Sequence, residues 1–220
     1  MWVDSHCHLD FPELAADREG LIARAVAAGI GTAVTISTRV RRFDEIRAIA
    51  EAHEGVWCSV GTHPHNAHEE LDVTAADLVA LAGHPKVVAI GEAGLDYHYD
   101  NSPREAQEQG FLTHIAAARE SGLPLVIHAR EADERVETIL REEMGKGAFK
   151  AVLHCFTGSE RLAMAGVELG LYVSFSGIAT YKSAANLREI AAKLPVDRIL
   201  IETDAPYLSP GKFRGKTNEP

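Results

Sequence analysis

The sequence predicts an α/β fold, a TIM-like (β/α)8 barrel of eight parallel strands that alternate with helices. Short runs rich in β-branched residues recur eight times along the chain, and stretches with helical spacing of apolar residues separate them. Strands that alternate with helices are joined by right-handed crossovers, and eight such units close into a barrel more readily than they form an open sheet. A length of 220 residues suits one core, so we expect a single domain over residues 1–220.

The expected strands are the eight apolar runs. In chain order they are Val3, Thr32–Ser37, Val56–Val60, Val87–Ile90, Leu125–Ile127, Ala151–Leu153, Leu171–Phe175 and Ile199–Ile201. After the eighth run only Asp204–Pro220 remains, and Pro, Gly, Ser and Lys dominate it. We therefore expect the final helix to be missing, either because the chain is truncated or because something else closes the barrel.

Two of the helices that link these strands have start and stop signals. Residues Asp17–Ala28 carry apolar side chains at helical spacing and stop at Gly29. A second helix starts at Ser102-Pro103-Arg104-Glu105, where we expect a capping box with proline at the first helical position. This helix can extend to Gly122.

The composition is that of a soluble globular protein. Hydrophobic residues make up 46% and charged residues 25%, and no apolar run approaches the ~18 residues of a membrane span. Asp4 follows Met1 so closely that no secretory signal fits between them. The three cysteines form no CxxC pair, which disfavours a disulfide framework and a zinc ribbon. We expect a cytoplasmic monomer with no membrane partner.

The formal net charge of −10 disfavours a protein that clamps long duplex DNA through many phosphate contacts. A phosphate substrate would need local positive charge, such as bound metal. Four residues at the expected catalytic face are our predicted substrate contacts. They are His63 and His65 after the third strand, Arg130 near the end of the fifth, and Arg214, which lies between Lys212 and Lys216 after the eighth.

Metal-binding side chains follow five of the predicted strands, at the end where such barrels carry their reacting groups. In His6-Cys7-His8 the two histidines point the same way on an extended chain, because side chains alternate along a strand. The strands that follow supply single histidines and carboxylates at equivalent positions. The six predicted ligands are His6, His8, Glu92, His128, His154 and Asp204.

Six ligands exceed the three of a mononuclear catalytic zinc site, so we expect two divalent metal ions, with Zn, Mn, Mg and Fe all open. Glu92 is the predicted bridge, because each carboxylate oxygen can bind one cation. Lys86 lies at the opposite end of the same strand, which disfavours a carbamylated-lysine bridge. Asp204, near the rim, is the predicted proton acceptor, and Glu202 is expected to orient a ligand from behind it.

Six segments of the chain resemble signatures of the TatD family, which are metal-dependent DNases of the amidohydrolase superfamily. The segments are Asp4-Ser5-His6-Cys7-His8-Leu9, Gly61-Thr62-His63-Pro64-His65, Gly91-Glu92-Ala93-Gly94-Leu95-Asp96-Tyr97, Pro124-Leu125-Val126-Ile127-His128, His154-Cys155-Phe156-Thr157-Gly158-Ser159 and Glu202-Thr203-Asp204-Ala205-Pro206-Tyr207-Leu208. The chain departs from the family at Thr217, where arginine is usual before Asn-Glu-Pro, and at Ala93, where Ile or Val is common.

The resemblance implies a deoxyribonuclease that trims single-stranded DNA from the 3′ end, with RNA as a further substrate. By motif position, one ion would be held by His6, His8, Glu92 and Asp204. The second would be held by Glu92, His128 and His154.

Two other functional classes compete with this one. An amide, lactone or ester hydrolase of the same superfamily, including an enzyme that removes an acyl group from tRNA, would need the same cations. A binding protein with a vestigial site is disfavoured, because all six predicted ligands are intact.

Overall fold

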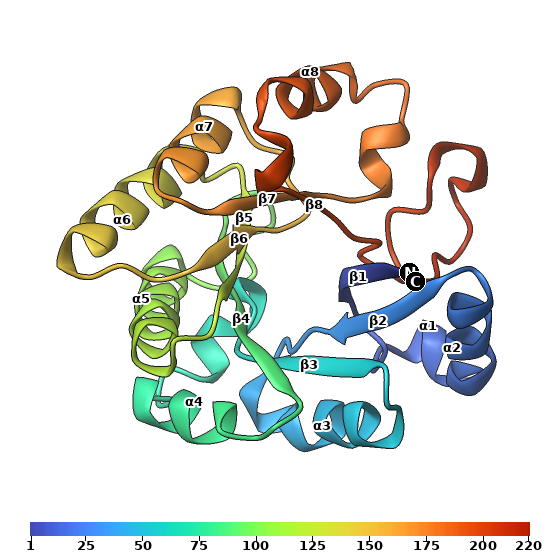
Figure 1. The fold of residues 1–220 in the computed structure, drawn as a ribbon. Coiled ribbons are helices and arrows are strands. Elements are labelled where there is room, and N and C mark those ends of the chain that lie inside the picture. Colours follow the sequence, from blue (N-terminus) through green and yellow to red (C-terminus); the bar gives the residue numbers. More distant parts are fainter.

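The computed structural model describes residues 1–220 as an eight-stranded parallel sheet in the order β1 to β8, with every strand beside its neighbour in sequence. The strands form the inner layer and the helices surround them (Figure 1). This arrangement confirms the predicted barrel. The strands are β1 Trp2–Cys7, β2 Ile30–Thr35, β3 Val56–Val60, β4 Val87–Asp96, β5 Leu125–Arg130, β6 Ala151–Leu153, β7 Tyr172–Phe175 and β8 Ile199–Ile201.

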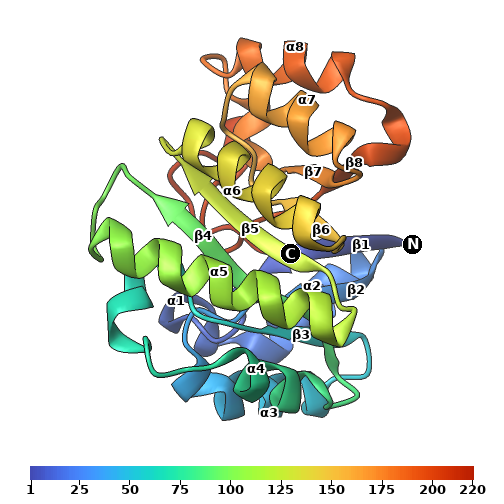
Figure 2. The ribbon, with the colours of Figure 1, turned by 90° about the vertical axis from the view of Figure 1, so that its left-hand side faces the viewer.

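At least one α-helix follows each of the first seven strands and packs on the outside of the sheet, as α5 and α6 do in Figure 2. The helices are α1 Pro12–Ala15, α2 Arg18–Ala27, α3 Phe43–Ala52, α4 Ala75–Ala82, α5 Arg104–Ser121, α6 Asp133–Lys146, α7 Glu160–Glu168 and α8 Ala185–Lys193. Five short 3-10 helices are η1 Val40–Arg42, η2 Pro64–Glu69, η3 Gly177–Thr180, η4 Val196–Arg198 and η5 Gly211–Phe213. No α-helix follows β8 within these residues, and none of the helices has the length and apolar character that a bilayer span requires.

The barrel closes where β1 meets the residues that follow β8. Cys7 and Ala205 form a parallel bridge. The backbone N–H of His8 donates to the carbonyl of Ala205 at 2.8 Å, and that of Asp204 donates to the carbonyl of His6 at 2.9 Å. These bonds bring three of the predicted ligands to one place on the rim.

A buried carboxylate supports the same seam. Asp4 accepts a hydrogen bond from the Thr203 backbone at 3.0 Å and another from the Thr203 hydroxyl at 2.5 Å. Asn218 donates from its side chain to the Thr203 carbonyl at 3.0 Å, so the last residues of the chain pack back onto the seam. Burial raises the pKa of Asp4 to about 6, although the bonds from Thr203 favour the charged form.

Three strands extend beyond their predicted ends, and for two of them, β4 and β5, the extension carries residues of the site. We expected β4 to stop at Ile90 and β5 at Ile127, but the two strands stay paired as far as Asp96 and Arg130. The apolar runs end earlier than the ladder because backbone hydrogen bonds, and not apolar side chains, continue the pairing. The predicted metal ligands of β4 and β5 therefore stand on strands, which fixes their directions better than loops would.

The predicted capping box at Ser102 is wrong. Helix α5 begins at Arg104 after Pro103, and no side chain caps it. The Ser102 hydroxyl instead donates to the carbonyl of His65 at 3.0 Å, so tertiary contact with the loop after β3 outweighs local capping. The predicted end is confirmed, since Gly122 takes a left-handed φ of 73° just after the helix.

Candidate metal centre

All six predicted ligands lie at the same end of the barrel, although they come from five different strands. The barrel presents the carboxyl ends of its parallel strands on one face, so residues distant in sequence converge there. His6, Glu92 and His128 stand on β1, β4 and β5. The other three, His8, His154 and Asp204, directly follow β1, β6 and β8 or lie within three residues of them.

The first cluster is centred on the Nε2 atom of His6. This atom lies 3.3 Å from Nε2 of His8, 3.4 Å from Oε2 of Glu92 and 3.6 Å from Oδ1 of Asp204. Nε2 of His8 is also 3.6 Å from Oδ1 of Asp204. Ligands about 2.1 Å from one ion in a tetrahedron lie roughly 3.4 Å apart, so this donor set fits a divalent cation.

The second cluster is centred on the other oxygen of Glu92. Oε1 lies 2.6 Å from Nε2 of His154 and 2.8 Å from Nδ1 of His128. Glu92 is 1% exposed and directs one oxygen to each cluster. Each oxygen of Glu92 therefore faces a different group of histidines.

His63 also reaches Glu92, which the sequence did not predict. Its Nε2 lies 3.4 Å from Oε1 of Glu92, while its Nδ1 accepts the backbone N–H of His65 at 3.1 Å. Burial holds the pKa of His63 well below its ordinary value, so the ring is neutral and carries its proton on Nε2. His63 therefore directs its protonated Nε2 toward Glu92, and only part of its side chain reaches the rim.

Asp96 is a buried carboxylate at the centre that sequence reasoning missed. Its Oδ2 lies 2.8 Å from Nε2 of His65 and 3.0 Å from Nε2 of His128. Asp96 follows Glu92 by four residues on β4, so both side chains lie on the same face of the strand. The alternation along β4 was the signal for it, but our predicted strand ended at Ile90.

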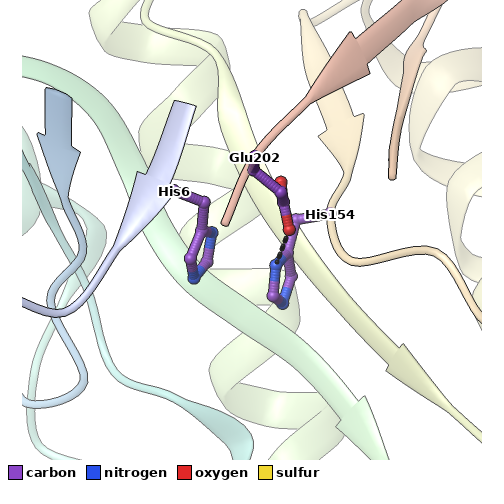
Figure 3. A group of neighbouring side chains, drawn as sticks. All are labelled: His6, His154 and Glu202. Atoms are coloured by element: carbon purple, nitrogen blue, oxygen red, sulfur yellow. Dashed lines mark hydrogen bonds and ion pairs between the residues drawn. The ribbon is translucent and has the colours of Figure 1, made fainter. Parts of the chain in front are cut away.

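Glu202 lies behind His154. Its Oε1 is 3.2 Å from Nδ1 of His154 (Figure 3). The same oxygen accepts the backbone N–H of Cys155 at 2.8 Å. The rings of His6 and His154 stack with centroids 3.9 Å apart. Because Glu202 faces Nδ1, the Nε2 atom of His154 is left to face Glu92.

Contacts at the centre lower the pKa values of two carboxylates, Glu92 and Asp204. Burial alone would raise the pKa of Glu92, but the charge of His154 and the hydrogen bonds from His128 and His154 outweigh it and hold that pKa well below its usual value. Burial likewise opposes ionisation of Asp204, yet His8 and His6 keep its pKa below the ordinary value. Both carboxylates are therefore ionised at neutral pH, as metal ligands must be.

The predicted cationic contacts lie against aromatic rings. The guanidinium of Arg130 stands over the ring of Tyr99 at 4.7 Å, and that of Arg214 stands over Tyr181 at 4.7 Å. His65, the remaining predicted contact, bonds to Asp96. Lys86 donates to backbone carbonyls at the opposite end of β4, including that of Val56 at 2.9 Å, and so lies away from both clusters.

Comparisons with known proteins place the chain in one family. The family model described as TatD related DNase matches residues 3–220. The chain is 41% identical to the uncharacterized metal-dependent hydrolase YabD of Bacillus subtilis over 223 residues, covering 100% of this chain and 86% of that protein. It is 35% identical to the 3′-5′ ssDNA/RNA exonuclease TatD of Shigella flexneri, covering 99% of this chain and 85% of that protein.

The structural comparison agrees. The crystal structure of YJJV, a TatD homologue from Escherichia coli, superposes with a TM-score of 0.91 at 32% identity, covering 100% of this chain and 85% of the other. The fold, the sequence match over nearly the whole chain and the convergent histidines and carboxylates lead to one conclusion. The chain belongs to the TatD family of metal-dependent hydrolases.

Proposed function

We propose that this protein hydrolyses phosphodiester bonds in single-stranded nucleic acid, as a 3′-5′ exonuclease on DNA that also accepts RNA. The observation that carries the proposal is Glu92, a buried carboxylate whose two oxygens face two separate groups of ligands. Support for the substrate comes from relatives named 3′-5′ ssDNA/RNA exonuclease.

We assign His6, His8, Glu92 and Asp204 to one divalent ion. We assign Glu92, His128 and His154 to a second. Ions held there would neutralise charge on the scissile phosphate and supply an activated water nucleophile. The chain itself keeps every ligand buried or nearly so, which strengthens electrostatic interactions in the centre by excluding water.

Asp204 is the proposed proton acceptor. Its side chain is 13% exposed, compared with 2% for Glu92, so it is the carboxylate that an incoming water and substrate reach. Its backbone φ of 56° places it on a sharp turn after β8, aimed at the rim. Glu202 fixes the ring of His154 from behind and does not contact the substrate in this scheme.

The surroundings of the centre suit a single strand. Tyr99 and Tyr207 are 53% and 48% exposed, and Tyr207 lies edge-on to Phe11, whose ring in turn stacks on His8 at 4.5 Å. Unpaired bases stack on such rings, whereas the bases of a duplex are already stacked on each other. We assign phosphate contacts to His65, Arg130 and Arg214, of which the two arginines supply local positive charge on an acidic protein.

The test is degradation of end-labelled DNA and RNA in the presence of each candidate divalent ion, compared with a chelated sample. We expect linear single strands to shorten from the 3′ end, circular single strands of the same sequence to persist, and chelation to stop the reaction. Equal loss of linear and circular strands would rule out an exonuclease. Hydrolysis of lactone or amide substrates with no cleavage of nucleic acid would replace the proposal with the competing hydrolase class.

A further inference from the structure

Asp96 is saturated by four hydrogen-bond donors although nothing in the proposed reaction requires it. Its Oδ1 accepts the backbone N–H groups of His98 at 3.0 Å and Tyr99 at 2.9 Å. Its Oδ2 lies 2.8 Å from Nε2 of His65 and 3.0 Å from Nε2 of His128. The side chain is 0% exposed, so these four donors take the place of water around the carboxylate.

The pairing with His128 determines which ring nitrogen carries the proton. An ionised carboxylate only accepts hydrogen bonds, so the nitrogen that faces it must carry hydrogen. That nitrogen is Nε2, and the opposite nitrogen, Nδ1, faces Oε1 of Glu92 at 2.8 Å. Without an ion, Nδ1 also carries hydrogen and donates to ionised Glu92. An ion shared with Glu92 would displace that proton, and Asp96 would keep the proton on Nε2, so the lone pair of Nδ1 would face the ion.

We propose that Asp96 is a positioning residue for the second ion, because it keeps the proton of His128 on Nε2 and directs the lone pair of Nδ1 to the ion shared with Glu92. This inference rests on the proposed two-ion function. Histidines that ligate metals are commonly oriented in this way by a carboxylate on their other nitrogen.

The arrangement at His154 supports the proposal. Glu202 faces Nδ1 of that ring at 3.2 Å, and Nε2 faces Glu92 at 2.6 Å. Both histidines of the second cluster thus have Glu92 on one side and a buried carboxylate on the other. His6 of the first cluster differs, because its Nδ1 is buried with no hydrogen-bond partner.

Asp96→Asn tests the proposal with little change in shape. The backbone N–H groups of His98 and Tyr99 require an acceptor, so the amide oxygen must stay on their side. The amide NH₂ then faces His128 and His65 and donates to them. His128 can accept that bond only by moving its proton from Nε2 to Nδ1, which removes the lone pair from the second cluster.

The measurements are the histidine tautomers by nitrogen NMR at neutral pH and zinc affinity by competition with a chromogenic chelator. In wild-type protein loaded with zinc we expect His128 to carry its proton on Nε2. In Asp96→Asn we expect the second zinc to bind roughly 10–100-fold more weakly, with the first zinc unaffected. The matched control is Glu131→Gln, which removes a 2.7 Å contact between a carboxylate and His98 nearby and should leave both affinities unchanged.

Three outcomes would overturn the proposal. One is a wild-type His128 with its proton on Nδ1, a result that needs no variant and so does not depend on whether Asp96→Asn folds. Another is a folded Asp96→Asn protein that binds the second zinc as tightly as wild type. The third is a wild-type protein that binds only one zinc, which would refute the two-ion function itself and is thereby distinguished from a failure at Asp96.

Discussion

Glu92 is the residue on which the two clusters depend, since its oxygens lie 3.4 Å from His6 on one side and 2.8 Å from His128 on the other. Glu92→Gln keeps the size of the side chain but removes the charge and one metal-binding oxygen. Two cations a few ångströms apart repel strongly in a partly dry site, and the shared charge offsets that repulsion. We expect at most one tightly bound ion and a loss of cleavage by orders of magnitude.

Elemental analysis, circular dichroism and single-turnover cleavage measure the effect of Glu92→Gln. The matched control is Glu108→Gln, which changes a partly buried carboxylate of α5 paired with Arg135, away from both clusters. Two retained ions with near-native cleavage in Glu92→Gln would show that the bridging assignment is wrong.

His114 of α5 should make the protein sensitive to acid. Its Nε2 accepts the backbone N–H of Thr62 at 2.9 Å and its Nδ1 donates to the carbonyl of Gly110 at 2.7 Å, so only the neutral ring fits. Burial lowers the pKa of His114 to about 4 from 6.5. Below pH 6.5 the unfolded chain gains a proton that the folded protein gains only near pH 4, so stability is lost as the pH falls through this window.

The expected contribution of His114 is a loss of roughly 2–3 kcal/mol in the free energy of unfolding between pH 7 and pH 4.5. Urea titrations at the two pH values measure it. His114→Gln does not titrate, so its stability should change less over this interval than that of wild type, even from a lower starting value. His84→Gln, at a partly exposed histidine, is the control. Equal pH dependence in wild type and His114→Gln would contradict the prediction.

Among the residues of the centre, the sequence identified the histidines and carboxylates that lie at or just after an apolar run. His6, His8, Glu92, His128, His154 and Asp204 converge as predicted, because parallel strands deliver their ends to one face. Asp96 was missed because the predicted strand ended at Ile90, so the alternation that aligns Asp96 with Glu92 was not applied to it. The direction of the His63 ring could not be predicted, because it follows from packing and not from spacing.

For single strands and helices, the predicted bounds were right where local sequence patterns set them and wrong where contacts with distant residues did. Strands β3, β6 and β8 begin and end where their apolar runs do. Strand β1 was predicted only at Val3 because the polar residues Asp4, Ser5 and His6 interrupt its apolar pattern, yet its backbone pairs with β2 from Trp2 to Cys7. The start of α5 was misjudged because Ser102 bonds across to His65, a partner 37 residues away that no local rule takes into account.

The loop after β8 carries a prediction of its own. In it, Arg214 is exposed and lies over Tyr181 of the loop after β7, so its charge lies on the same face of the barrel as the centre. Arg214→Ala should weaken binding of single strands and lower the slope of log affinity against log salt by roughly 0.7–1, as the loss of one phosphate contact predicts.

The matched control for Arg214→Ala is Arg198→Ala. Arg198 also stands over a tyrosine, Tyr172, at 5.3 Å, but it lies just before β8 and therefore at the opposite end of the barrel. Binding titrations at several salt concentrations compare the two. If both variants keep the wild-type slope, Arg214 makes no phosphate contact and is an ordinary surface residue.

For the molecule as a whole, the backbone hydrogen bonds that close the barrel also bring together residues of the first cluster. The seam between β1 and the residues after β8 joins His6 and His8 to Asp204 through backbone hydrogen bonds. Glu92, His128 and His154 come from β4 to β6, on strands that pair with each other independently of the seam. Weakening the seam should therefore affect the two clusters unequally.

Asp4→Ala tests this coupling. Asp4 is 2% exposed, and its carboxylate accepts two hydrogen bonds from Thr203 across the seam. Hydrogen bonds to a charged group contribute about 1.5–3 kcal/mol each, so we expect the free energy of unfolding to fall by a few kcal/mol. Zinc should bind more weakly to the first cluster while its affinity for the second stays near wild type.

Chemical denaturation and zinc titration measure the two effects, with Asp100→Ala, at an exposed aspartate paired with Arg104, as control. Equal weakening of both zinc sites would show that the seam supports the whole rim, and unchanged stability would show that Asp4 contributes nothing to closure.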